Sequence, residues 1–299
     1  MKNYSFIIPH HNSPELLYRC LDSIPQRDDI EIIVVDDNSD IDKRPQVNRS
    51  DVHMIFIDAE HSKGAGRARN YGLREATGKW LVFADCDDFY EKDFIVELDR
   101  FLSSEHDVVI WNYYNLYDPE KKTWIENDVN LYMKALRYQP NNQTLQKAVK
   151  YSVNEPWNKM IKRSFVLNNN LIYEEVPVGN DAFFSISSVD NAHSVGFIFT
   201  RLYYWVKNPK GLTHHKTKDK LLAKLNSSGR ANLIKSNAKA WGAICPLHSG
   251  IKSNLKSVGF GITIFFYVHR LFNGIPWWRV YYQHWKFVKL AKFILNDRK

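Results

Sequence analysis

Cysteine is scarce in this 299-residue chain, which holds only Cys20, Cys86 and Cys245, without the close spacing of a metal site. This rules out a disulfide framework and is typical of a reducing compartment. Long apolar runs are also missing. The longest uncharged one, residues 258–268, is about half as long as a membrane-spanning helix, and the run near the N-terminus meets Pro9 too early for a signal peptide. We therefore expect a cytoplasmic protein that does not cross a membrane.

Acidic residues are almost absent from the last third of the chain. Residues 207–299 contain 18 Lys and Arg but only two acids, a net charge of +16, whereas the rest of the chain has a net charge of −8. The change falls near Pro209 and Gly211, which interrupt the preceding pattern. We therefore expect a mildly acidic domain over residues 1–206 and a basic, helical C-terminal region over residues 207–299.

The first domain alternates short apolar runs with amphipathic ones. Strands are predicted at residues 5–9, 31–37, 52–58, 79–85 and 107–112. Helices are predicted at residues 14–24, with Ser13 as N-cap, and at residues 66–76 and 92–102. Strands and helices in alternation predict an α/β fold with a Rossmann-like, doubly wound, mostly parallel sheet.

Polar clusters follow three of the predicted strands, at residues 9–12, 36–39 and 85–88. Turn formation explains a single Asp at a strand end, but it does not readily explain three such clusters. In doubly wound sheets, ligands bind at the carboxyl ends of the strands. The clusters therefore predict a ligand site at this edge of the sheet.

The cluster at residues 85–88 contains the pair Asp85 and Asp87, followed by Asp88. Residues i and i+2 of a strand share one side, so both carboxylates can approach one point. Carboxylate oxygens suit Mg²⁺ or Mn²⁺, which proteins commonly share with substrate phosphates. A D-x-D pair alone is a weak signal, but its place after a buried strand favours a site for one of these cations.

Four stretches, taken in order, resemble the family 2 glycosyltransferases: residues 6–24, 31–40, 64–88 and 157–165. The resemblance extends from about Ser5 to about Tyr204. It implies the A-type glycosyltransferase fold and an inverting, metal-dependent enzyme that uses a nucleotide-sugar donor. Many members build bacterial capsules, O-antigens and lipooligosaccharides, so we expect a role in surface polysaccharide synthesis.

The resemblance also implies a donor site. Asp37 would accept a hydrogen bond from the ring N–H of uracil, which favours a UDP-sugar, and His11 would stack on the base where the family usually has an aromatic residue. Lys63 and Arg69 would contact the diphosphate, and Asp85 the ribose. The predicted donor set also includes Pro9, Cys86 and Trp157. Three residues have a structural alternative to a role in donor binding. Asp36 can be a turn residue, Arg69 a solvated helix residue and Trp157 a buried core residue.

For the metal, the resemblance implies Asp87 as a direct ligand, with Asp85, and His214 as a third. An inverting transfer needs a base to take the proton of the acceptor hydroxyl. Asp181 matches the family's base, although Asn180 stands where the family has Glu. The alternative for Asp181 is the N-cap of a helix over residues 182–188, in which case Glu174 or Glu175 would be the base.

The segment from Pro276 predicts a helix without acids. A helical projection gathers Arg279, Lys286 and Lys289 on one side, with Trp277, Tyr281, Trp285 and Val288 largely on the other. Aromatics and bases on one helix favour an anionic membrane surface on the inner face of the cell membrane. This fits a saccharide or lipid-linked acceptor. The alternative is a helix packed on the protein. No nucleic-acid motif accompanies the charge, so we expect no nucleic acid partner.

Two other functions compete with glycosyl transfer. A sugar nucleotidyltransferase also uses acidic metal sites, but it favours an early Gly-rich, basic phosphate loop, and residues 9–15 offer none. A non-catalytic, membrane-recruited binding subunit would have little need of Asp37, Asp85, Asp87 and Asp181.

Overall fold

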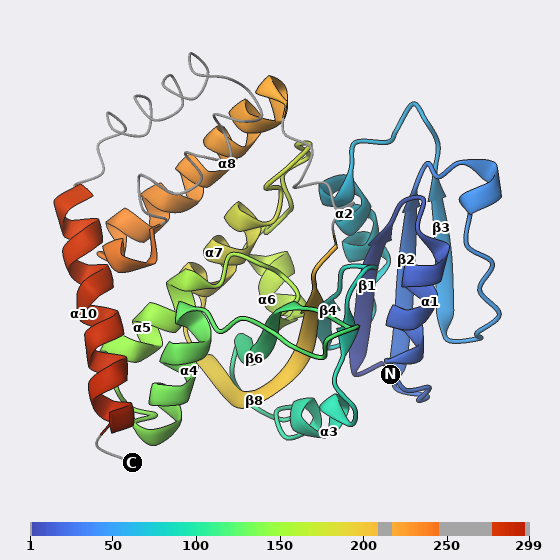
Figure 1. Ribbon diagram of the computed structural model, residues 1–299. Helices are drawn as coiled ribbons and strands as arrows, with labels where there is room; N and C mark the ends of the chain where they lie inside the picture. The colour runs from blue at the N-terminus through green and yellow to red at the C-terminus, as the bar shows by residue number, and fades with distance from the viewer. Residues whose placement is uncertain (1, 209–216, 245–276, 297–299) are drawn as a thin grey trace. The chain divides into compact units, whose positions relative to one another are not determined.

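The computed structural model describes residues 2–208, 217–244 and 277–296 (Figure 1). The predicted His214 lies outside these residues. The chain forms two compact units, each built from separate segments. The first unit contains Met1–Glu126, Glu155–Glu175 and Asn191–Asn208, and the second contains Asn127–Asn154, Val176–Asp190 and Pro209–Lys299. The boundary expected after residue 206 lies close to the last crossing between the units, and two earlier segments also belong to the second unit.

The first unit holds a mixed eight-stranded sheet with the order β3-β2-β1-β4-β7-β6-β8-β5. Its strands are β1 (Tyr4–His10), β2 (Ile30–Asp37), β3 (Val52–Ile57), β4 (Trp80–Phe83), β5 (Phe89–Tyr90), β6 (Val108–Tyr117), β7 (Lys159–Lys162) and β8 (Val195–Val206). Strands β1 to β4 and the pair β6–β8 are parallel, whereas β7 and β5 run antiparallel to their neighbours. The predicted α/β class with a mostly parallel sheet is confirmed.

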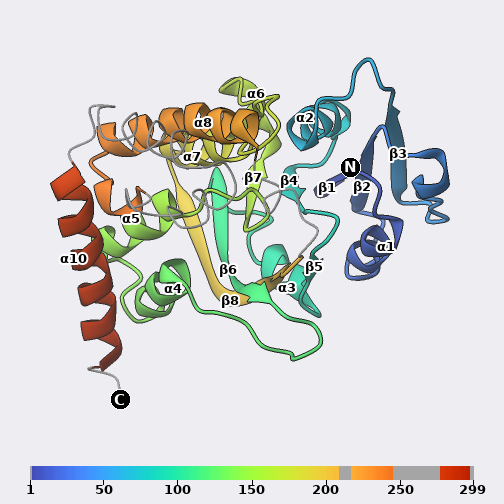
Figure 2. The same cartoon turned by 45° about the horizontal axis from the view of Figure 1, so that its top comes forward.

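Helices α1 (Pro14–Asp22) and α2 (Ala65–Glu75) lie on opposite faces of the β1–β3 part of the sheet (Figure 2). Strands β1 and β4 are buried along their whole length, as expected for strands covered on both faces. Gly72 lets α2 approach β1, because a Cβ there would stand 2.5 Å from Cγ2 of Ile7. This packing fixes the strand ends at which the polar clusters lie.

The remaining elements of the first unit are the short helices η1 (Ile41–Lys43), α3 (Phe94–Asp99) and α6 (Arg163–Asn168). Helix α3 is shorter than the helix predicted at residues 92–102. Ser13 occupies the N-cap position of α1, but its side chain makes no capping hydrogen bond. Its backbone N–H instead donates to Nε2 of His10.

Helices dominate the described part of the second unit. They are α4 (Asp128–Tyr138), α5 (Gln143–Ser152), α7 (Ala182–Asn191, which ends at the unit boundary), α8 (Lys218–Asn237), η3 (Trp241–Ala243) and α10 (Trp277–Asn296). Helix α10 lies beside α4 and α5 (Figure 1). None of the described helices combines the length and the apolar character that a membrane span requires.

Helix α10 buries Val280, Phe287, Ala291 and Ile294. The ring of Phe287 packs edge-on against Tyr132 of α4, with 5.9 Å between centroids. This buried stripe corrects the predicted division of the helix. Its aromatic residues do not lie opposite its bases, because the side opposite the exposed bases is occupied by the buried stripe.

The exposed face of α10 combines aromatic and basic side chains. It carries Tyr281, Tyr282, Trp285, Phe293, Arg279, Lys286, Lys289 and Lys292. One face of the helix therefore packs on the protein, as in the packed-helix alternative, and the other presents rings and charges outward. Binding to a membrane surface stays a prediction.

Candidate active site

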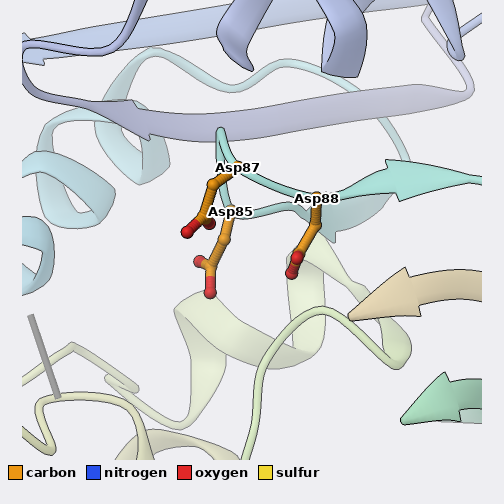
Figure 3. Close-up of side chains that lie close together, drawn as sticks. All are labelled: Asp85, Asp87 and Asp88. Carbon is orange, nitrogen blue, oxygen red and sulfur yellow. The ribbon is translucent and has the colours of Figure 1, made fainter. Parts of the chain in front are cut away.

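An acidic turn formed by Asp85, Asp87 and Asp88 follows the buried strand β4. One carboxylate oxygen from each residue can be chosen so that all three lie within 4.8 Å of one another. Figure 3 shows the side chains of Asp85 and Asp87 next to each other, with Asp88 further along the same turn. The predicted metal ligands Asp85 and Asp87 are thus brought together, and Asp88 joins them.

The end of β8 holds this turn in place. The N–H of Asp85 donates to the hydroxyl of Tyr203 at 3.0 Å, and the N–H of Val206 donates to Oδ1 of Asp88 at 2.7 Å. Asn208 donates from Nδ2 to Oδ2 of Asp87 at 2.7 Å. Sequence reasoning did not identify these partners of the turn.

Arg19 of α1 is a further residue that the sequence did not single out. Its guanidinium donates to the backbone carbonyl of Asp87 and lies 5.2 Å from the centre of the Phe89 ring. Arg19 occupies the last turn of an ordinary amphipathic helix, and nothing in its neighbourhood in the sequence marks it. It stabilises the backbone of the turn and leaves the Asp87 carboxylate to other partners.

Among the residues that the structure describes, the partners of the acidic turn do not offset all of its negative charge. Burial, and then the charge of Asp85, raise the pKa of Asp87. Burial, and then the charges of Asp87 and Asp85, raise the pKa of Asp88 well above its usual range. Arg69 compensates only part of this charge: its Nη2 lies 2.5 Å from Oδ1 of Asp85. A site of hard oxygen donors with excess negative charge fits Mg²⁺ or Mn²⁺.

Asp36 has a structural role. It is fully buried, and its carboxylate accepts hydrogen bonds from the N–H and the hydroxyl of Ser39. Nδ1 of His10 lies 2.7 Å from Oδ2 of Asp36. Because Nε2 of His10 accepts the N–H of Ser13, the ring proton sits on Nδ1 and is donated to Asp36. This network fixes the loop after β1.

Asp37 differs from its neighbour because half of its carboxylate is unused. Oδ2 accepts the N–H of Gly64 at 2.7 Å, and the positive φ of Gly64, 84°, is readily adopted by glycine. Oδ1 is buried and has no hydrogen-bond partner among the described residues. A buried acceptor without a donor is costly. Asp37 therefore offers an acceptor for a ligand N–H, at the end of β2. His11 is exposed and donates from Nδ1 to the carbonyl of Asp37.

The basic residues near the start of α2 meet Glu175. Arg67 donates from Nε and Nη2 to Oε2 of Glu175 at 2.9 and 2.7 Å, and Nζ of Lys63 lies 3.9 Å from the same oxygen. The hydrogen bonds from Arg67 lower the pKa of Glu175. A carboxylate with a lowered pKa is a poor proton acceptor, so Glu175 is a weak candidate for the base. Lys63 keeps 53% of its side chain exposed, whereas Arg69 keeps only 5%.

Three other predicted donor residues lie in or beside the core. Trp157 is 2% exposed and stacks on Tyr203 with 4.8 Å between ring centroids, which favours the buried role over a sugar-facing wall. Pro9 is buried within β1. Cys86 is partly exposed within the acidic turn.

Asp181 belongs to the second unit. Its carbonyl accepts the N–H of Ser185 at 2.9 Å, so its backbone occupies the position just before α7. This is where an N-cap residue stands, and it is equally compatible with a side chain that serves as a base.

A parallel-strand edge with a carboxylate cluster and an unpaired buried acceptor is typical of α/β proteins that bind a nucleoside diphosphate together with a divalent cation. Residues 5–167 match the sequence profile of the family described as "Glycosyl transferase family 2". The chain belongs to this family.

Several known proteins are similar to this chain. EpsH of Bacillus subtilis is 28% identical over 210 residues, which are 67% of this chain and 60% of EpsH. The poly(ribitol-phosphate) beta-N-acetylglucosaminyltransferase TarS of Staphylococcus aureus is 24% identical over 222 residues, 71% of this chain and 36% of TarS. WfaP of Escherichia coli is 32% identical over 120 residues, 39% of this chain and 47% of WfaP. The matches thus span less than two thirds of each relative's length.

A crystal structure of TarS residues 1–349 with UDP-GlcNAc shares the fold. The superposition has a TM-score of 0.65 at 16% identity and covers 100% of this chain and 91% of that one. The likeness extends the fold assignment beyond the segment that the family description matches.

Proposed function

We propose that this protein is a metal-dependent, inverting glycosyltransferase that moves a sugar from a UDP-sugar to a saccharide or lipid-linked saccharide in surface polysaccharide synthesis. The observation that carries the proposal is the acidic turn, whose three carboxylates converge at the carboxyl end of β4. Family membership supports glycosyl transfer. TarS was solved with UDP-GlcNAc, and WfaP is named a UDP-Glc:alpha-D-GlcNAc-diphosphoundecaprenol beta-1,3-glucosyltransferase, which supports a UDP-sugar donor and a lipid-linked acceptor.

The donor nucleotide would be recognised at the end of β2. The unpaired Oδ1 of Asp37 would accept the ring N–H of uracil, and the exposed ring of His11 would stack on the base. Lys63, with its exposed side chain, would reach the diphosphate. Arg69 would act through its ion pair with Asp85, orienting that carboxylate.

Asp85, Asp87 and Asp88 would hold Mg²⁺ or Mn²⁺. When bound, the ion supplies positive charge that offsets the charge developing on the departing nucleoside diphosphate. Asp181 would accept the proton of the acceptor hydroxyl as that oxygen attacks the anomeric carbon.

The test is UDP release from UDP-glucose, UDP-galactose and UDP-GlcNAc, in Mn²⁺ and after EDTA treatment. A glycosyltransferase releases UDP in the presence of metal and, with a suitable acceptor, forms a new glycoside. A sugar nucleotidyltransferase would instead release pyrophosphate from UTP and a sugar phosphate, and a non-catalytic subunit would bind nucleotide without turnover. Asp42→Asn, at an exposed position in η1, serves as the matched control for substitutions in the acidic turn.

We propose as well that the exposed face of α10 binds an anionic membrane surface, which would bring the enzyme to lipid-linked acceptors. Four bases and four aromatic rings share this face, and the helix contains no acid. Basic residues near an anionic leaflet contribute about 1 kcal/mol each, and aromatic rings suit the interfacial region. Sedimentation with vesicles of anionic and of zwitterionic lipid tests this: binding to both alike would contradict the electrostatic part.

A further inference from the structure

We infer that an aromatic shelf beside the acidic turn binds a sugar ring of the acceptor saccharide, a proposal that rests on the proposed glycosyl transfer. The shelf consists of the rings of Phe89, Tyr114, Tyr117, Trp124 and Tyr204. Tyr204 stacks on Tyr114 with 4.2 Å between centroids and an angle of 8°, and on Phe89 at 4.5 Å and 18°. Trp124 meets Tyr114 edge-on at 5.0 Å. The rings thus form one continuous, mutually supported group.

The exposure of the shelf distinguishes it from an aromatic core. Trp124 is 41% exposed, and the other four rings are only partly buried. A second aromatic group of the same unit, Trp157 with Tyr113 and Tyr203, shows the contrast, because each of its rings is at most 2% exposed. Core packing explains the second group. It does not explain why Trp124 is exposed and the other rings of the shelf are only partly buried, and exposed apolar patches commonly mark binding sites.

A break in strand β6 brings two of the rings together. In a regular strand Tyr114 and Tyr117 would point to opposite faces, because side chains alternate. The register between β6 and β8 shifts between these two residues, and Leu116 adopts a positive φ of 49°. The ring centroids of Tyr114 and Tyr117 consequently lie 6.4 Å apart. Non-glycine residues rarely adopt this conformation, and backbone strain of this kind clusters at functional sites. Bulges next to active sites re-aim side chains in this way.

Polar groups lie over and beside the rings of the shelf. The guanidinium carbon of Arg201 lies 5.4 Å from the ring centre of Tyr114 and 5.5 Å from that of Trp124, and Nη2 donates to Glu126 at 2.7 Å. The hydroxyl of Tyr204 donates to Oε2 of Glu91 at 2.5 Å. A pyranose ring has an apolar C–H face and a rim of hydroxyls. The exposed ring surface of Trp124, with a guanidinium over the ring and carboxylates nearby, matches both features.

The chain connects the shelf directly to the acidic turn. Phe89 is the residue after Asp88, and Arg19 contacts both the backbone of Asp87 and the ring of Phe89. Four rings of the shelf lie on β5, β6 and β8, and Trp124 follows β6 along the chain, whereas Asp37 ends β2, on the other side of β4 in the strand order. The uracil assigned to Asp37 therefore leaves the shelf available for a second substrate, which in glycosyl transfer is the acceptor.

The test is Trp124→Ala in the full chain, assayed with methyl and octyl β-glycosides of glucose, galactose and N-acetylglucosamine as acceptor probes. We expect the acceptor KM to rise about five- to tenfold, the scale of one lost aromatic contact, with the donor KM unchanged. Phe56→Ala is the matched control: Phe56 is also exposed, at 49%, and lies beneath an arginine, Arg44, but on β3. It should leave both values unchanged.

Saturation-transfer NMR with the same glycosides, without donor, measures binding independently of turnover. If the wild type binds the glycosides and Trp124→Ala weakens this binding, the shelf is a sugar-binding site. This conclusion holds even if no transfer occurs and the proposed function is wrong. If transfer occurs and Trp124→Ala matches the wild type in acceptor KM and NMR signal, the shelf is wrong and the proposed function survives. Absence of binding by the wild type to every glycoside at millimolar concentrations also overturns the shelf.

Discussion

Replacing Asp87 by Asn removes one negative charge from the acidic turn and keeps the shape of the side chain. Burial and the charge of Asp85 raise the pKa of Asp87 above its value in the unfolded chain. The ionised carboxylate therefore opposes folding, and wild-type stability falls as the pH rises through the raised pKa. Without metal, we expect Asp87→Asn to be more stable than the wild type at pH 8. The advantage should shrink as the pH falls and disappear where the carboxylate is protonated in both states.

Added Mn²⁺ should reverse this order. A ligand at 100 times its Kd stabilises the folded state by about 2.7 kcal/mol. For a chain of 299 residues, with roughly 2.1 cal/mol/K of unfolding entropy per residue, this raises Tm by about 4 °C. Asp87→Asn should lose most of the rise. Donor turnover in Mn²⁺ should fall by roughly 100-fold or more, because the ion contributes several kcal/mol to stabilising the leaving group.

Differential scanning calorimetry between pH 5 and 9, with EDTA or with Mn²⁺, measures both effects, and Asp42→Asn controls for the loss of a carboxylate elsewhere. Two results would refute the reasoning. One is a metal-free Asp87→Asn that is less stable than the wild type at pH 8. The other is an equal rise of Tm in Mn²⁺ for the variant and the wild type, which would place the ion outside the acidic turn.

The other predictions concern the base, the nucleotide and the membrane. In Asp37→Asn, the amide oxygen should still accept the N–H of Gly64, and the NH₂ group would face the ligand. Calorimetry should then show UDP binding weakened by about 1.5–3 kcal/mol and a relative gain in CDP binding, because the ring nitrogen of cytosine is an acceptor. Unchanged UDP binding would contradict the uracil role of Asp37. Asp181→Asn should slow transfer to an authentic acceptor by roughly 10²–10⁴-fold with UDP affinity preserved, whereas a pure N-cap would tolerate Asn and retain near wild-type rates. Exchanging Lys286, Lys289 and Lys292 for Gln should weaken sedimentation with anionic vesicles by about 3 kcal/mol and leave transfer to a soluble acceptor intact; wild-type-like sedimentation would exclude the proposed surface. Deleting the whole helix would be a poorer experiment, because it would also uncover the buried stripe.

The sequence predicted the part of the site that follows from strand periodicity. Asp37 and Asp85 lie at the ends of apolar runs. A buried strand fixes the position of the residues at its carboxyl end, where ligands bind in such sheets. The partners of the acidic turn were beyond reach for a physical reason. Tyr203 and Val206 meet Asp85 and Asp88 across a separation of 118 residues, and no local pattern encodes such a pairing.

Helix α10 shows a different limit. Its helical character followed from composition and spacing, and the structure confirms a helix from Trp277 to Asn296. The sequence could not say which residues meet a neighbour, because aromatic side chains suit both a core and an interface. Phe287 is buried against α4, whereas Trp285, two residues earlier, is 54% exposed. Only the packing partner decides between them.

The hydrogen bond from Asn208 to Asp87 bears on how this protein can be divided for study. Asn208 is the last residue of the first unit before the chain passes into the second. A fragment cut at residue 206, where composition alone would place the boundary, would retain every strand of the sheet and yet lose the amide that orients Asp87. Such a fragment could fold and still misreport metal affinity. A shortened protein should therefore end beyond Asn208. A boundary chosen from the charge distribution alone would remove the hydrogen bond between Asn208 and Asp87.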